Sequence, residues 1–238
     1  MDAALAHANI ENLTELWRLM DCVELEGGLT QSTRWPYRCW QGIDRQTEDG
    51  PGVSGQIPAG YLYPVWQAGD TTTRLEQQLQ QKGLEVGLEQ LAMILPLAHD
   101  YPATASPRLE VSRVRNHREA EAWAELCGRA FGYQLDTGVI DHLRQEASVE
   151  VLWAFRKEEP VATAILYRTG PVMGLHQVGV PPELQGQGIA RELMLILLAR
   201  AQAAGAEYVC LQASAAGEPL YRRLGFLSQF RIRSYRRT

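Results

Sequence analysis

The stretch "ELQGQGIARELM", residues 183–194, decides the fold of this chain. Two glycines, Gly186 and Gly188, flank one glutamine, and an uninterrupted apolar run follows them. We expect a strand ending at Val180 to lead into this turn, and a helix to begin near Gly188. The first turn of a helix carries free main-chain N–H groups and a partial positive charge, and glycines lack the Cβ atoms that would keep a ligand away. The turn therefore predicts an anion site suited to a diphosphate.

The same spacing also occurs where a helix simply packs closely on a strand, so the motif alone leaves both interpretations open. Two common phosphate loops are excluded. The chain has no G-x-x-x-x-G-K-[ST] pattern, and it shows neither a third glycine nor a ribose-binding acid in a βαβ unit. The elements before the turn also differ, because the pattern predicts three successive strands at 149–157, 159–170 and 172–180 that suit antiparallel hairpins.

The rest of the second half alternates helices and strands. A strand is expected at 109–116, and Asn116 caps a helix at 117–132 with Glu119 in the capping-box position. Further elements follow in this order: a helix at 137–147, the helix after the glycine turn up to Gly205, a strand at 207–214, a helix at 217–225 and one or two strands at 226–237. The order predicts an α/β (α+β) domain.

The first half is less regular and contains a weak internal echo of the end of the chain. Helical spacing is clear at 10–20, and a threonine-capped helix ending at Gly83 precedes an apolar, strand-like segment. Aligning Gly83 with Gly225 matches two helix–glycine–strand units. Chance and a duplicated unit whose first copy has decayed both explain this echo.

Composition narrows the class of protein. The chain has 238 residues, a net charge of −5 and 45% hydrophobic residues, which is typical of a globular protein and argues against a general nucleic-acid or anionic-membrane binder. The longest apolar run, "LMLILLA", is too short to span a bilayer, and the N-terminus lacks the basic start of a signal peptide, so we expect a cytoplasmic protein. The four cysteines and five histidines show no metal-binding spacing, and we expect reduced, mostly buried thiols and no metal.

Two motifs together resemble one family. "VGVPPELQGQGIARELM" (178–194) is similar to the acetyl-CoA-binding signature of the GNAT superfamily of N-acetyltransferases, and "ASAAGEPLYRRLGF" (213–226) is similar to that family's late helix. The resemblance covers about 108–238. It implies the GNAT fold, a mixed and mostly antiparallel central sheet flanked by helices, and direct transfer of an acetyl group from acetyl-CoA to a primary amine. The residues that would contact the cofactor are Val178, Gly179, Val180, Gln185, Gly186, Gln187, Gly188, Ile189, Ala190, Arg191 and Ser214.

The resemblance also implies catalytic roles. Tyr221 matches the tyrosine that protonates the leaving thiolate in many members, although a packing role is the alternative. Some members use a glutamate as general base at the position that Gly174 occupies here, so that carboxylate is missing. His176 lies two residues further on the same strand face and is a candidate base, directly or through water, or else a packed histidine. Ser214 replaces an asparagine that often touches the cofactor.

The domain prediction assigns residues 1–105 to a degenerate GNAT-like or cap domain without catalytic function and 106–238 to the acetyl-CoA-binding catalytic domain, joined by a linker at 101–107. Two tandem GNAT-like halves would place Leu79 where Tyr221 lies. The first half holds six aromatic residues that either wall a substrate cleft or form a core: Trp35, Trp40, Trp66, Tyr37, Tyr61 and Tyr63.

Two functions remain open. The first is an N-acetyltransferase acting on a small-molecule or peptide amine, with no nucleic-acid or membrane partner and with a homodimer left open. The second is a catalytically silent module that binds acetyl-CoA or a partner protein.

Overall fold

The structure is a computed structural model that describes residues 3–46, 57–68, 71–97 and 108–237. The chain forms two compact units, Met1–Ile94 with Gln212–Thr238 and Leu95–Leu211. The expected linker at 101–107 and the boundary at 105 lie outside the described residues. The end of the chain belongs to the first unit, which differs from the division expected from sequence. The functional roles of 1–105 and 106–238 stay a prediction.

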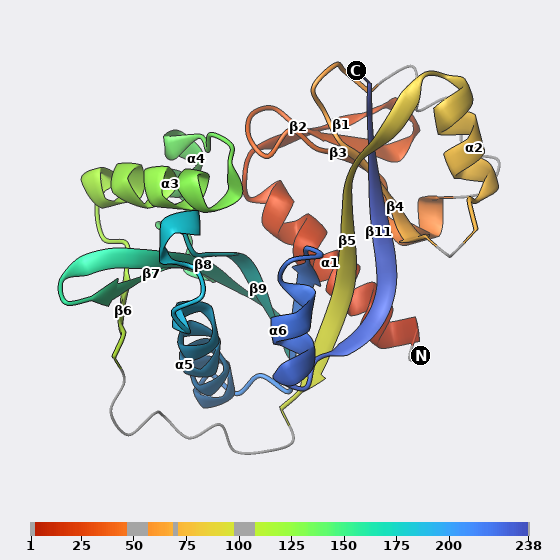
Figure 1. The fold of residues 1–238 in the computed structure, drawn as a ribbon. Helices are drawn as coiled ribbons and strands as arrows, with labels where there is room; N and C mark the ends of the chain where they lie inside the picture. The colour runs from red at the N-terminus through yellow and green to blue at the C-terminus, as the bar shows by residue number, and fades with distance from the viewer. Residues whose placement is uncertain (1–2, 47–56, 69–70, 98–107, 238) are drawn as a thin grey trace. The chain divides into compact units, whose positions relative to one another are not determined.

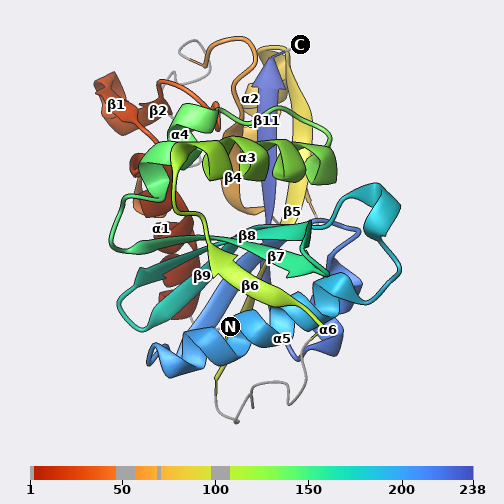
Figure 2. The same ribbon diagram turned by 90° about the vertical axis from the view of Figure 1, so that its left-hand side faces the viewer.

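The second unit carries the glycine turn and a mostly antiparallel sheet (Figure 1). The strand order is β10-β9-β8-β7-β6, and only the β9–β10 pair is parallel. Figure 2 shows α3 and α4 on one face of this sheet and α5 on the other. The elements are β6 (Glu110–Arg113), α3 (His117–Phe131), α4 (Thr137–Leu143), β7 (Val149–Arg156), β8 (Glu159–Thr169), β9 (Val172–Gly179), the 3₁₀ turn Pro182–Leu184, α5 (Ile189–Ala203) and β10 (Tyr208–Ala213). The predicted fold class and the three antiparallel strands are confirmed.

Helix α3 shows how the local sequence determines where a helix of this unit begins, where it ends and which face packs on the sheet. The Asn116 side chain accepts a hydrogen bond from the Glu119 main-chain N–H at 3.0 Å, as the capping pattern predicts. Gly132 ends the helix in the left-handed region with φ +76°. The indole of the fully buried Trp123 donates to the Leu152 carbonyl of β7 at 2.6 Å, so the apolar face of α3 is fixed against the sheet.

The first unit contains a small antiparallel sheet and three long strands. The small sheet has the order β1-β2-β3, and the long strands have the antiparallel order β4-β11-β5. The elements are α1 (Ala3–Arg18), β1 (Cys22–Leu25), the 3₁₀ turns Glu26–Gly28 and Ile43–Arg45, β2 (Leu29–Ser32), β3 (Cys39–Trp40), β4 (Tyr63–Ala68), α2 (Arg74–Gln81), β5 (Leu84–Pro96), α6 (Glu218–Arg223) and β11 (Leu227–Arg237). The final segment forms a single strand that pairs with β4 and β5, which explains why it belongs to this unit.

The internal echo corresponds to two matching segments of the first unit. Gly83 has φ +79° between α2 and β5, and Gly225 has φ +92° between α6 and β11. The two strands pair with each other, from Leu84 opposite Arg237 to Ile94 opposite Leu227. The helix–glycine–strand pattern is therefore confirmed at both places, whereas an ancestral duplication stays a prediction.

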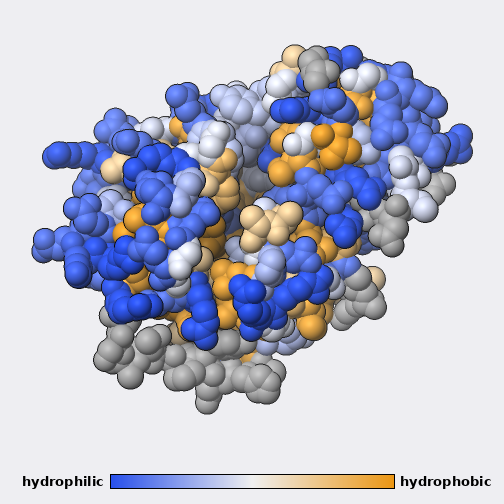
Figure 3. Space-filling view, in the orientation of Figure 1, coloured by the Kyte–Doolittle hydropathy of each residue, from blue (hydrophilic) through white to orange (hydrophobic). Residues whose placement is uncertain are grey.

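Most of the aromatic residues of the first half form a core. Trp35, Trp40, Tyr63 and Trp66 are each 5% exposed or less, and Leu79 packs in the same unit's buried apolar cluster. The core interpretation is confirmed for these four, and among the six only Tyr37 is largely exposed, since Tyr61 is partly buried. The face drawn in Figure 3 is mainly hydrophilic with smaller apolar areas.

The cysteines behave as expected. Cys39, Cys127 and Cys210 are buried, and desolvation raises the pKa of each thiol to about 12, while Cys22 is half-buried. Such thiols stay protonated and inert at neutral pH. None of the helices among the described residues is long and apolar enough to cross a membrane.

Candidate functional site

The glycine turn of the second unit requires glycine because of its backbone conformation. Gly186 has φ +76° and Gly188 has φ +79°, a region that costs energy for any residue with a Cβ. A Cβ built on Gly186 would meet nothing within 4 Å, and one on Gly188 would meet only Arg108 Nη2 at 3.8 Å. The turn is therefore open to the surroundings rather than packed under the sheet, which disfavours the close-packing interpretation.

The main-chain donors of this turn point to an anion. Helix α5 begins after Gly188 without a side-chain cap, and its first main-chain bond to the turn runs from the Glu192 N–H to the Gly188 carbonyl at 3.1 Å. In the part of the chain that the structure describes, no acceptor is found for the main-chain N–H groups of 186–191. Six successive uncompensated donors at a helix N-terminus match the physical requirements of a phosphate site.

Gln185 supports the turn. Its main-chain N–H donates to the Pro182 carbonyl at 3.2 Å, and its side-chain amide donates to the Val180 carbonyl at 3.0 Å. These bonds join the end of β9 to the start of the turn. The observed role of Gln185 is to shape the loop, and its predicted cofactor contact stays a prediction.

A cation that the sequence did not single out lies beside the turn. Glu192, in the first turn of α5, accepts hydrogen bonds from the Arg108 and Leu109 main-chain N–H groups and from Arg108 Nε at 3.1 Å. This clamp holds a largely exposed guanidinium next to Gly188. The predicted Arg191 is also exposed. Nothing local marks Arg108, because only the fold brings it to a turn about 80 residues away along the chain.

Strand β9 bends just before it reaches the turn. His176 pairs with Ile165 and Gly179 with Thr163, so one extra residue lies in β9, and Gln177 has φ +49°. Thr163 Oγ1 holds the bend by donating to the Gln177 carbonyl at 3.0 Å. A bulge interrupts the alternation of side chains. The alternation rule used for His176 therefore does not extend to Val178 and Val180.

In the described part of the chain, one edge of β9 has no neighbouring strand beyond Gly174. The parallel register with β10 covers only Val172–Gly174, opposite Tyr208–Cys210. Within the described ranges no strand register is found for the rest of that edge, which includes Val178, or for Val180 just after the strand. Its main-chain groups are suited to pairing with an extended ligand that carries amides.

Tyr221 and Ser214 belong to the first unit. The Tyr221 ring makes an edge contact with Phe226, with ring centroids 5.8 Å apart. Burial raises the pKa of Tyr221 to about 12, so its hydroxyl is protonated at neutral pH and able to donate a proton. Ser214 Oγ accepts from the Gly217 N–H at 3.2 Å, and the Ser214 carbonyl accepts from the Glu218 N–H at 2.9 Å. Ser214 therefore positions the start of α6.

The comparisons with known proteins agree with this geometry. Residues 114–226 match the model of the acetyltransferase (GNAT) family. Residues 114–226 therefore form an acetyltransferase domain of the GNAT family. No curated protein matches it.

Solved GNAT structures share the fold over nearly the whole chain. A GCN5-related N-acetyltransferase from Kribbella flavida is 18% identical, with 97% of this chain and 94% of that chain covered and a TM-score of 0.64. One from Sphaerobacter thermophilus is 17% identical, with 93% and 84% covered and a TM-score of 0.64. A GNAT-family protein from Novosphingobium aromaticivorans is 14% identical over 100% of both chains, with a TM-score of 0.64. The GNAT prediction for the family and the fold is confirmed, and these similarities extend to the first half.

The general base of this GNAT chain is the least defined part of the site. Position 174 in β9 is a buried glycine, so the carboxylate that a glutamate would supply there is missing. His176 lies two residues further along β9. Its side chain is 7% exposed, and the residue interacts with neighbouring groups. Its role as base stays a prediction. Among the residues that the structure describes, no group of three or more His, Cys, Asp or Glu is arranged to hold a metal ion.

Proposed function

We propose that this GNAT enzyme moves an acetyl group from acetyl-CoA directly to a primary amine of a small molecule or a peptide, in the cytoplasm. The observation that supports this best is the run of main-chain donors at 186–191 without acceptors in the described protein. Acetyl-CoA would supply an activated acetyl thioester. The open turn fits its diphosphate, because a Cβ built on Gly186 would meet nothing within 4 Å and one on Gly188 would meet only the cationic side chain of Arg108.

Each part of the donor has a candidate holder. The amides of 186–191, with Arg108 beside them, would bind the diphosphate. The open edge of β9 at Val178, with Val180 just after the strand, would pair with the amide-containing arm like an added strand. A main-chain N–H at this edge would also face the thioester carbonyl and stabilise negative charge on its oxygen.

Two side chains would move protons. Tyr221 would donate its phenolic proton to the leaving thiolate, and its raised pKa keeps that proton in place until the reaction. His176 would accept the proton of the attacking amine, directly or through a water molecule. Residues 1–105 would take no part in these transfers.

The experiment is a thiol-release assay with acetyl-CoA and a panel of primary amines. We expect turnover with at least one amine, and we expect Tyr221→Phe to lower kcat by about 10²–10⁴-fold while the KM for acetyl-CoA changes little. Tyr208→Phe, which removes the hydroxyl of a half-buried tyrosine in β10, is the matched control and should keep the wild-type rate. A Tyr221→Phe enzyme with unchanged kcat would contradict the acid role.

The second candidate is a catalytically silent module that binds acetyl-CoA or a partner protein. The glycine at position 174, where a carboxylate would activate the amine, favours it. Calorimetric binding of acetyl-CoA without thiol release for any amine in a broad panel would support this module over the enzyme. Sedimentation of the same sample would test the homodimer, which the sequence leaves open.

A further inference from the structure

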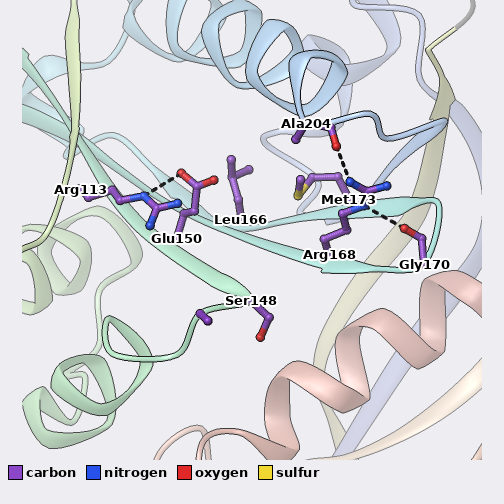
Figure 4. Close-up of a pocket in the computed structure, with 9 residues that line it drawn as sticks. Arg113, Ser148, Glu150, Leu166, Arg168, Gly170, Met173 and Ala204 are labelled. Atoms are coloured by element: carbon purple, nitrogen blue, oxygen red, sulfur yellow. Dashed lines mark hydrogen bonds and ion pairs between the residues drawn. The ribbon is translucent and has the colours of Figure 1, made fainter.

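A separate cavity of about 410 Å³ lies in the second unit (Figure 4). The glycine turn lies at the N-terminal end of α5, whereas this cavity lies at the other end of that helix. Its lining includes Ala204, just beyond the C-terminal end of α5. A helix of 15 residues is about 22 Å long, so the cavity is distinct from the proposed donor site. Its volume lies in the range of small-molecule pockets. The residues that determine its chemistry are Arg113, Ser148, Glu150, Leu166, Arg168 and Met173.

Positive charge exceeds negative charge around this cavity. Glu150 is the acidic residue of the lining, and its Oε2 accepts hydrogen bonds from Arg113 Nε at 3.2 Å and from Arg200 Nε at 2.7 Å. Two guanidinium groups thus share one carboxylate. Arg168 adds a third positive charge, and it contacts main-chain carbonyls rather than an acid. The cavity therefore favours an anionic group.

The arginines keep donors that the protein does not use. A guanidinium has five N–H donors. Arg168 donates from Nε to the Gly170 carbonyl at 2.9 Å and from its two Nη atoms to the Ala204 and Gly205 carbonyls, which fixes its side chain against the end of α5. The side chain of Arg113 makes one hydrogen bond in the described protein, through Nε. Both Nη groups of Arg113 remain for a carboxylate, which guanidinium groups bind in a two-pronged geometry.

The rest of the lining is apolar. Leu166 of β8 and Met173 of β9 are buried, and Ala147 and Ala204 also line the cavity. Figure 4 shows Leu166 and Met173 between the Arg113–Glu150 pair and Arg168. We propose that this cavity binds a small organic carboxylate, whose anionic group Arg113 holds and whose apolar body lies against Leu166 and Met173. This inference does not depend on the proposed transfer reaction.

The test uses benzoate as probe and benzamide as its uncharged counterpart, with the full chain and no acetyl-CoA. Methyl NMR of methionine-labelled protein reports the place of binding, because Met173 is one of five methionines and Met173→Leu assigns its signal. We expect benzoate to shift the Met173 methyl signal and to bind at least tenfold more tightly than benzamide. Binding that leaves the Met173 signal unchanged would overturn the proposal.

Two variants test whether the charge of Arg113, rather than the shape of the cavity, determines the affinity for benzoate. Arg113→Gln should weaken benzoate binding at least fivefold and leave benzamide unaffected, whereas Arg118→Gln, an exposed arginine of α3 outside the cavity, should change neither. Because Arg200 still pairs with Glu150 in the Arg113→Gln protein, we expect that variant to fold, and thermal unfolding checks this. Equal affinity for benzoate and benzamide, or displacement of benzoate by an equal concentration of inorganic phosphate, would show that no organic carboxylate is recognised.

Discussion

Helices α2 and α5 begin in opposite ways. At α2, Thr73 Oγ1 accepts from the Glu76 N–H at 3.2 Å and the Glu76 carboxylate accepts from the Thr73 N–H at 2.7 Å, so the end is closed by its own side chains. At α5, Gly188 has no side chain that could cap the helix. A missing cap costs about 1 kcal/mol of stability. Helix α5 nevertheless forms, because the burial of its apolar side fixes it on the sheet, and its first main-chain N–H groups have no acceptor within the described protein.

The largest expected effect lies at the closed helix end. The Glu76 side chain is fully buried, and its Oε1 accepts hydrogen bonds from Arg233 Nη1 and from the Tyr235 hydroxyl, each at 3.1 Å. Glu76→Ala removes the cap and leaves Arg233 without this partner. We expect the free energy of unfolding at pH 7 to fall by about 3 kcal/mol, measured by urea denaturation. Glu85→Ala, an exposed glutamate at the start of β5, is the control and should change little.

The surroundings of Glu76 also lead us to expect that part of the free energy of unfolding is lost at acidic pH. Burial alone raises the pKa of Glu76, but hydrogen bonds from the Thr73 main chain and from Arg233 outweigh it, and the net pKa is lowered. A lowered carboxylate pKa stabilises the fold above the unfolded value of about 4.3, and this stability is lost as the pH falls through the folded pKa. The wild type should therefore lose more stability than Glu76→Ala below that pH. Parallel pH curves for the two proteins would contradict this assignment.

At the open helix end, the predicted effect is on the donor rather than on folding. Gly188→Asp places a carboxylate where we propose the diphosphate binds, and Gly188→Asn adds a side chain of similar size without charge. Both residues tolerate a positive φ better than most. We expect calorimetry to show about 100-fold weaker acetyl-CoA binding for the aspartate, close to 2.7 kcal/mol, and a smaller loss for the asparagine. Equal losses would mean that size alone matters and would argue against a phosphate at this turn.

The capped helix α3 provides the opposite test, in which we expect a loss of stability without a loss of acetyl-CoA binding. Asn116→Ala removes the cap of α3, and we expect the free energy of unfolding to fall by about 1 kcal/mol. The affinity for acetyl-CoA should stay within about twofold of the wild type, because a structural cap contributes to folding alone. A large loss of affinity in this variant would remove the distinction between closed and open helix ends.

The features predicted well from sequence are those set by neighbouring residues. Asn116 caps α3 and Thr73 caps α2, since each interaction spans three residues. The bend at Gln177 was missed, because a bulge depends on the register with β8 and on the Thr163 hydroxyl. The membership of β11 in the first unit was missed for a similar reason, since its pairing with β4 and β5 joins distant parts of the chain. The glycine turn and the start of α5 were predicted correctly because the two glycines and the helix lie within a few residues of one another.

The smallest predicted effect concerns Arg108, the cation that only the fold reveals. Its guanidinium is largely exposed and shares its charge with Glu192, so solvent and this ion pair both weaken its attraction for a diphosphate. We expect Arg108→Gln to weaken acetyl-CoA binding about fourfold, close to 0.8 kcal/mol, at low salt. The difference from wild type should shrink as salt is added, because the contribution is electrostatic. Arg118→Gln is the control for net charge, and an equal loss in both variants would assign the effect to the overall charge rather than to the turn.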